Sequence, residues 1–138
     1  MTVAGALEQI NGNLITVLNN LTISASATHT LLATNTNTDL ILGNEQIIFS
    51  GDGRIILNDD LNNRIYGTLS NYELINRTTI EGAGQIGFNR MLLDNEGTIE
   101  ATGNISLIID LSVGSVLNNE GILRATARRS LRETRQGH

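Results

Sequence analysis

The chain has 138 residues, of which 40% are hydrophobic, 17% charged and 3% aromatic, and its formal net charge is −5. This length fits one domain, and an ordinary apolar share with so few charges argues against general disorder. The absence of cysteine excludes a disulfide framework, thiolate zinc sites and a cysteine nucleophile, and no apolar run is long enough for a transmembrane helix.

The order of residue types indicates short strands. Aliphatic and β-branched residues dominate, and the 17 Asn and 14 Gly interrupt them every few positions. This pattern disfavours helices and is typical of strands joined by turns. Residues 21–25 alternate apolar and polar side chains, as a strand with one buried face does. Residues 1–12 lack a basic segment and a long apolar segment, so we expect no signal peptide in this chain.

Candidate polar sites in the first half of the chain are few. His29 is the only internal histidine and has no acidic or nucleophilic neighbour in the sequence, so we expect no catalytic role for it. Asp52, Asp59 and Asp60 could form a carboxylate cluster for calcium or sugar chemistry, as in a carbohydrate-binding or polysaccharide-cleaving protein. The alternative, which we favour, is that Asp59 and Asp60 form a turn after an apolar run. We find no aromatic row that could stack sugars or bases.

The second half of the chain repeats itself. Three windows share the pattern Leu-x-Asn-x-[Gly/Thr]-[Thr/Ile]-[Ile/Leu]-x-[Gly/Ala]-[Ala/Thr]-[Gly/Ala]. These windows are residues 74–84, 93–103 and 117–127. A weaker copy over residues 48–53 places Phe49 in the position of Ile80, at a wider spacing than separates the other copies. We therefore expect another coil or a long loop between these two copies, supplied by residues 61–69.

A repeat of roughly 20 residues fits the coil of a parallel β-solenoid, in which equivalent residues of successive coils lie above one another, and is too short for a propeller blade. Two inward stacks are predicted: Ile80, Ile99 and Leu123, and Leu74, Leu93 and Leu117. A hydrogen-bonded amide column is predicted from Asn76, Asn95 and Asn119. A positive φ is expected at Gly97 and Gly121. An outward ladder is predicted from Glu81, Glu100 and Arg124.

The C-terminal segment differs from the rest in charge. Residues 124–138 hold five Arg and one Glu, which gives +4 and leaves −9 for residues 1–123. The acidic body disfavours nucleic acid and anionic membranes as partners. We predict a solenoid domain over residues 1–127, followed over residues 128–138 by a basic tail or a short capping helix.

Residues 79–87 and 93–102 resemble the β-helical repeats of large bacterial surface and secreted proteins, such as filamentous-haemagglutinin-like and autotransporter-passenger-like repeats. The likeness covers about residues 74–126, and more loosely residues 14–58. It implies a right-handed parallel β-helix that serves as a stalk or display scaffold. It implies no catalytic residues.

Together these observations predict an all-β protein, a right-handed parallel β-helix of five or six coils. We expect a structural or display module of a bacterial surface or secreted protein, mediating adhesion or protein–protein contact as part of a larger protein. We expect no enzymatic activity, cofactor or metal. Its expected partner is a protein or glycan on a surface, and self-association through the solenoid ends is a further option.

Overall fold

The computed structural model describes residues 1–126 and 131–134, and every regular element within them is a strand. The 18 strands form three six-stranded sheets, A, B and C. Sheet A contains β1 (Thr2–Val3), β4 (Leu21–Ile23), β7 (Gln46–Ser50), β10 (Glu73–Asn76), β13 (Leu92–Asn95) and β16 (Asn118–Asn119). Sheet B contains β2 (Ala6–Ile10), β5 (Thr28–Leu32), β8 (Arg54–Leu57), β11 (Thr79–Gly82), β14 (Thr98–Ala101) and β17 (Ile122–Ala125). Sheet C contains β3 (Leu14–Val17), β6 (Thr38–Leu42), β9 (Asn63–Gly67), β12 (Gly84–Ile86), β15 (Leu107–Asp110) and β18 (Leu131–Thr134).

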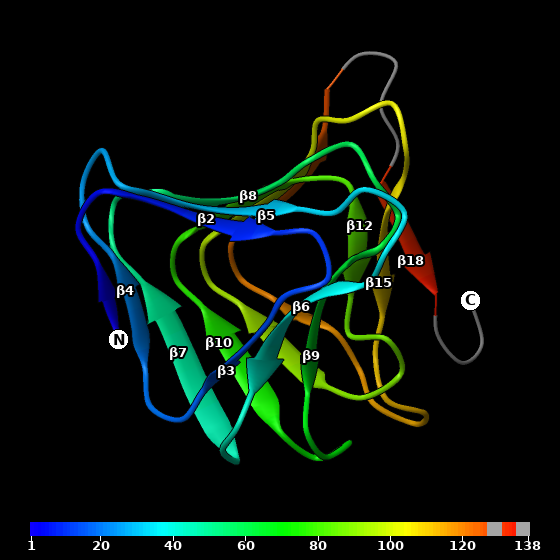
Figure 1. Ribbon diagram of the computed structural model, residues 1–138. Helices are drawn as coiled ribbons and strands as arrows, with labels where there is room; N and C mark the ends of the chain where they lie inside the picture. The colour runs from blue at the N-terminus through cyan, green and yellow to red at the C-terminus, as the bar shows by residue number, and fades with distance from the viewer. Residues whose placement is uncertain (127–130, 135–138) are drawn as a thin grey trace.

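The chain winds as a β-solenoid. Successive strands visit sheets A, B and C in turn, and the chain then returns to sheet A one layer further along (Figure 1). Neighbouring strands in all three sheets are parallel. The six strands of each sheet are linked by five full turns of the chain, so the predicted all-β parallel solenoid is confirmed. Its right-handed sense stays a prediction.

Both predicted aliphatic stacks are present. In sheet B the register joins Ile80 to Ile99 and Ile99 to Leu123. In sheet A it joins Leu74 to Leu93, and Leu117 packs against the same core. The first two members of each stack are buried, whereas Leu117 and Leu123, in the last coil, are partly buried. Each fully buried aliphatic side chain contributes about 2 kcal/mol to folding, so these stacks hold successive coils together.

The predicted amide column is also confirmed. Asn76 and Asn95 are fully buried, and Asn76 Nδ2 donates to Asn95 Oδ1 over 2.9 Å. Asn95 Nδ2 in turn donates to Asn119 Oδ1 over 2.8 Å. The two buried amides are therefore paired in the interior, where an unpaired amide would be costly, and the column ends at the exposed Asn119.

The positive φ expected at Gly97 and Gly121 is wrong, because neither glycine is among the residues with positive φ. Their role is close packing between coils. A Cβ at Gly97 would lie 2.2 Å from Thr78 O, and one at Gly121 would lie 2.1 Å from Gly97 O. Both contacts are far shorter than van der Waals separation, so a side chain at either position would push two coils apart.

The expected alignment of Phe49 with Ile80 is also wrong. Phe49 stands opposite Asn76, and Ile55 stands opposite Ile80. The corner between sheets A and B is longer in this coil, with six steps from Phe49 to Ile55 but four from Asn76 to Ile80. The sequence comparison assumed corners of equal length, and it therefore placed Phe49 opposite Ile80. No coil intervenes at residues 61–69, because β7 pairs directly with β10 and β9 belongs to sheet C of the same coil.

The C-terminal segment continues the solenoid where it is described. Leu131–Thr134 forms β18, which pairs with β15 so that Leu131 stands opposite Leu107. These four residues form a strand, and Leu131 packs against the core. The predicted division at residue 127 stays a prediction. The remainder of the predicted tail, residues 128–130 and 135–138, lies outside the described residues.

Candidate functional site

The carboxylates predicted as a possible cluster do not meet. Asp52 precedes β8, whereas Asp59 and Asp60 follow it, so they lie at opposite ends of that strand. Asp60 accepts hydrogen bonds from the backbone N–H of Asn35 (2.9 Å) and of Asn62 (2.8 Å), and these bonds lower the pKa of Asp60. Asp59 Oδ1 accepts from the N–H of Ile105 over 2.8 Å. Both side chains thus fasten corner backbone, in agreement with the turn interpretation.

His29 is part of the core. It stands in the inward column of sheet B, opposite Ile55, and is fully buried. Its Nε2 lies 3.1 Å from Gln9 Oε1, and its Nδ1 has no hydrogen-bond partner. Burial lowers the pKa of His29 to about 4, because the charged ring would lose its hydration. The neutral ring has no acid or nucleophile beside it among the described contacts.

The predicted outward ladder of sheet B is confirmed. Glu81 stands opposite Glu100, and Glu100 opposite Arg124. The charges are paired between coils, because Arg124 Nη2 lies 3.2 Å from Glu100 Oε1 and Arg54 forms an ion pair with Glu81. Both arginine side chains are 53% exposed, so each pair adds little to stability.

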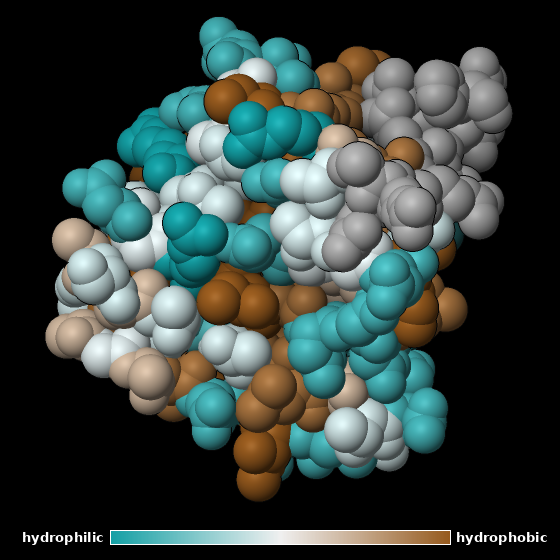
Figure 2. Space-filling model, turned by 90° about the horizontal axis from the view of Figure 1, so that it is seen from above, coloured by the Kyte–Doolittle hydropathy of each residue, from teal (hydrophilic) through white to brown (hydrophobic). Residues whose placement is uncertain are grey.

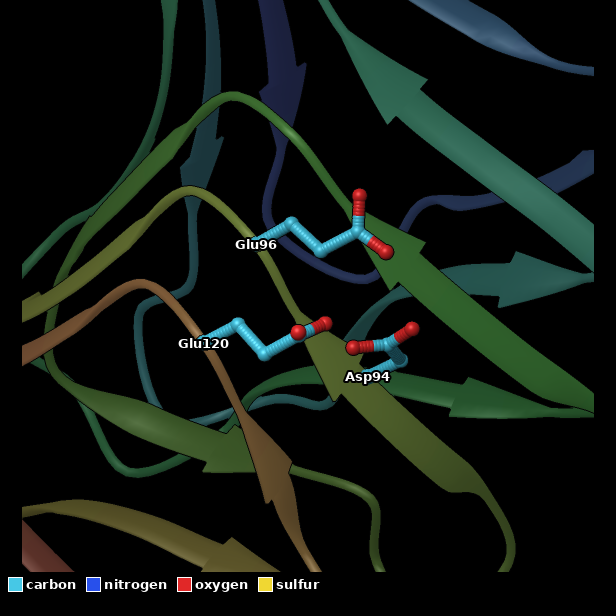
Figure 3. A group of neighbouring side chains, drawn as sticks. All are labelled: Asp94, Glu96 and Glu120. Carbon is cyan, nitrogen blue, oxygen red and sulfur yellow. The ribbon is translucent and has the colours of Figure 1, made fainter.

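A group of three carboxylates lies on sheet A and its corner with sheet B. Asp94, Glu96 and Glu120 point toward one another (Figure 3), with one oxygen from each lying within 4.8 Å of the others. Glu96 also accepts from Arg77 Nε over 2.8 Å, which lowers the pKa of Glu96. Burial, and then the hydrogen bond and negative charge of Glu96, raise the pKa of Asp94. A cation here would need further ligands such as water, because Ca²⁺ takes about six to eight oxygens. A proton on Asp94 would reduce the repulsion among the three carboxylates.

A second polar group lies on the outer face of sheet C. Arg64 on β9 stands opposite Asp39 on β6, and its Nε and Nη2 each lie 2.7 Å from a different carboxylate oxygen of Asp39. Tyr66 donates its hydroxyl to Asp39 Oδ2 over 2.8 Å. The side chains of Arg64 and Asp39 are only 12% and 7% exposed. The bidentate bond to Asp39 raises the pKa of Arg64, so the guanidinium stays charged at all ordinary pH values.

The corner after β12 folds an aromatic side chain over this ion pair. Phe88 and Asn89 have φ values of 50° and 53°, and Arg90 N donates to Gly87 O over 2.7 Å, as in a type I′ turn. A positive φ is a real outlier for so bulky a residue and costs about 1 kcal/mol or more. Contacts of the Phe88 ring offset this cost, because Arg64 Cζ lies 4.4 Å from its centroid.

We call Asp39, Arg64, Tyr66, Phe88 and Arg90 the arginine–aromatic cluster. The ring centroids of Tyr66 and Phe88 are 5.5 Å apart, and Arg90 Cζ lies 5.8 Å from the Tyr66 centroid. Arg64 Cζ lies 5.1 Å from that same centroid. Two guanidinium groups and two aromatic rings therefore meet at one place on the surface.

Sequence analysis missed this cluster and found no aromatic row. Its five members come from three successive coils, and only the pairing of β6 with β9 brings Asp39 and Arg64 together. The spacing of Arg64 and Tyr66 by two positions on one strand was the available signal, because such residues share a face.

Comparisons with protein-family models, curated proteins and solved structures gave no match. Within the described part of the chain, no helix has the length and apolar character needed to cross a membrane.

Proposed function

We propose that the chain is a structural and display module of a bacterial surface or secreted protein, where it serves in adhesion or protein–protein contact as part of a larger protein. The observation that supports this role is the continuity of the column. Its aliphatic stacks and amide column run from coil to coil through the interior.

The outer surface supports the same proposal. Among the described residues, four ion pairs join side chains of successive coils: Arg54 with Glu81, Arg64 with Asp39, Arg77 with Glu96, and Arg124 with Glu100. The face seen from above, over β2, β5 and β8, mixes hydrophilic and hydrophobic side chains (Figure 2). A continuous column with a face of mixed polarity is suited to holding and presenting contact surfaces.

The resemblance of residues 79–87 and 93–102 to bacterial β-helical surface repeats is the second support, and it motivates the proposed location. Antibodies against the chain should label intact cells of the source organism, and external protease should remove that signal. A signal that appears only after the cells are permeabilised would contradict the proposed location.

The adhesive role has its own test. Beads coated with the chain should adhere to host-cell monolayers or immobilised matrix proteins more than uncoated beads do. Beads coated with Ile99→Asp, which places a charge in the fully buried stack, should lose that adhesion together with the fold. Adhesion equal to that of uncoated beads for the native chain would contradict the role.

Self-association through a solenoid end is part of the proposal. An open hollow of about 350 Å³ lies at the first coil, lined by Met1–Leu7. Leu7 and Ile15 are only partly buried there, so a second copy could cover them. Light scattering should then show mass increasing with protein concentration, and a constant monomer mass would contradict self-association.

A further inference from the structure

We propose that the arginine–aromatic cluster is a binding site for acidic sugars, with Phe88 as the stacking surface and Arg90 as the carboxylate ligand. This inference is independent of the display role, because it rests on a local arrangement of side chains on sheet C.

The first support is an aromatic ring held at the surface. Phe88 is 38% exposed although Arg64 lies 4.4 Å from its ring centroid. The turn that carries it has positive φ at two successive non-glycine residues, so the chain adopts an unfavourable backbone to hold this ring in place. A sugar ring presents a flat C–H face that can pack on the exposed part of such a ring, while its hydroxyls remain in water.

The second support is charge. The charge of Arg64 is balanced by the bidentate bond to Asp39. Arg90 is exposed, lies by the Tyr66 ring and has no ion pair with any described residue. The cluster therefore keeps one uncompensated positive charge within an otherwise acidic body. A carboxylate fits the planar donor fork of a guanidinium bidentately.

The third support is the geometry of the surrounding sheet, which favours a sugar over a peptide. β9 is paired on both sides, with β6 and with β12, so no free strand edge is available there for a peptide to extend. A ligand must therefore be recognised by side chains. A sugar ring is already rigid, so it loses less conformational entropy on binding than a flexible peptide would.

The test titrates the full chain with short oligogalacturonates and, in parallel, with uncharged galactose oligomers of the same length, by calorimetry and by NMR chemical shifts. We expect the acidic oligomer to bind and to shift the ring resonances of Phe88 and Tyr66. We expect at least tenfold weaker binding of the neutral oligomer, and weaker binding of the acidic one as salt is added. No binding of the acidic oligomer at millimolar concentration, or equal binding of both, would overturn the proposal.

Variants locate the site. Phe88→Ala and Arg90→Gln should each weaken oligogalacturonate binding at least tenfold, whereas Phe88→Tyr should retain most of it. Arg90→Lys keeps the charge but not the planar donor fork, so its affinity should fall between those of the native chain and Arg90→Gln. Arg77→Gln is the matched control, since Arg77 is an exposed arginine on another part of the surface, paired with Glu96. Far-UV circular dichroism checks that each variant is folded, and Arg90→Gln keeps the test valid if Phe88→Ala is destabilised. Unchanged affinity in Arg90→Gln would overturn the proposal.

Two competitors define the class of ligand. Inorganic phosphate or a poly-glutamate peptide should displace the oligogalacturonate only at much higher concentration. Displacement by phosphate at equal concentration would indicate a simple anion site, and displacement by poly-glutamate would indicate a peptide site. Either result would overturn the assignment to sugars.

Discussion

Replacing Asn95 with alanine tests how strongly the buried amide column holds successive coils together. Asn95 Oδ1 accepts from Asn76 Nδ2 over 2.9 Å, and its Nδ2 donates to Asn119 Oδ1 (2.8 Å) and to Ile122 O (3.1 Å). Each such bond contributes about 1 kcal/mol net, and a buried donor left unpaired costs about 1–3 kcal/mol. The substitution removes these three bonds and a weaker one from Nδ2 to Gly97 O (3.4 Å), and it leaves Asn76 with an unpaired N–H. We therefore expect the free energy of unfolding to fall by about 4–6 kcal/mol.

Urea unfolding followed by far-UV circular dichroism measures this change, provided that the dependence on urea concentration keeps its slope. Asn119→Ala is the matched control from the same column. Asn119 is exposed, and its own donated bond, to Gly121 O, is 3.5 Å long. Water can replace that bond. The control also removes the bond from Asn95 Nδ2 to Asn119 Oδ1, but Asn95 Nδ2 keeps Ile122 O as an acceptor, so the control should lose only about 1–2 kcal/mol. Equal losses in the two variants would show that burial of the column is not what makes it stabilising.

Three further predictions concern the core and its titrating groups. Ile99→Asp should abolish the thermal unfolding transition, because it buries a charge, whereas Glu100→Gln should leave the melting temperature nearly unchanged; equal behaviour would contradict the assignment of inner and outer faces. Because burial lowers the pKa of His29 from 6.5 to about 4, the unfolded state binds more protons in that range, and stability falls by about 3 kcal/mol relative to His29→Leu as the pH falls through it. A pH-independent difference between these two chains in urea titrations would refute this. Because the pKa of Asp94 is raised in the folded state, its ionisation lowers stability as the pH rises. Asp94→Asn should therefore raise the melting temperature at neutral pH and not at about pH 3, and an equal shift at both pH values would contradict the reasoning.

The fold could be predicted wherever the coils have equal corners. Ile80, Ile99 and Leu123 repeat with their flanking Asn and Gly, so their stacking follows from spacing alone. Phe49 could not be aligned in this way, because the longer corner that follows it changes the spacing without changing the strand register. Leu131 was missed because the sequence around it lacks the turn pattern, although its side chain still fits the column.

The arginine–aromatic cluster could not be predicted for a different reason. Asp39 and Arg64 become neighbours only through the register of sheet C, which the sequence did not reveal before residue 70. The position of Phe88 depends on a corner with positive φ at two non-glycine residues, and no residue preference signals such a turn at phenylalanine. The predicted carboxylate cluster could not be judged from the sequence either. Asp52 and Asp59 are close in sequence, but β8 lies between them and places them at opposite ends of a strand.

The unequal corners have a consequence for how such a molecule can change. The chain takes a much longer path from Leu21 to Phe49 than from Leu74 to Leu93, yet both pairs are direct neighbours in sheet A. Insertions and deletions can therefore change the length of the corners while the strand register within each sheet stays the same. A bend can be lengthened, shortened or exchanged for a foreign peptide as a local event, so that new recognition loops can be grafted onto an unaltered framework.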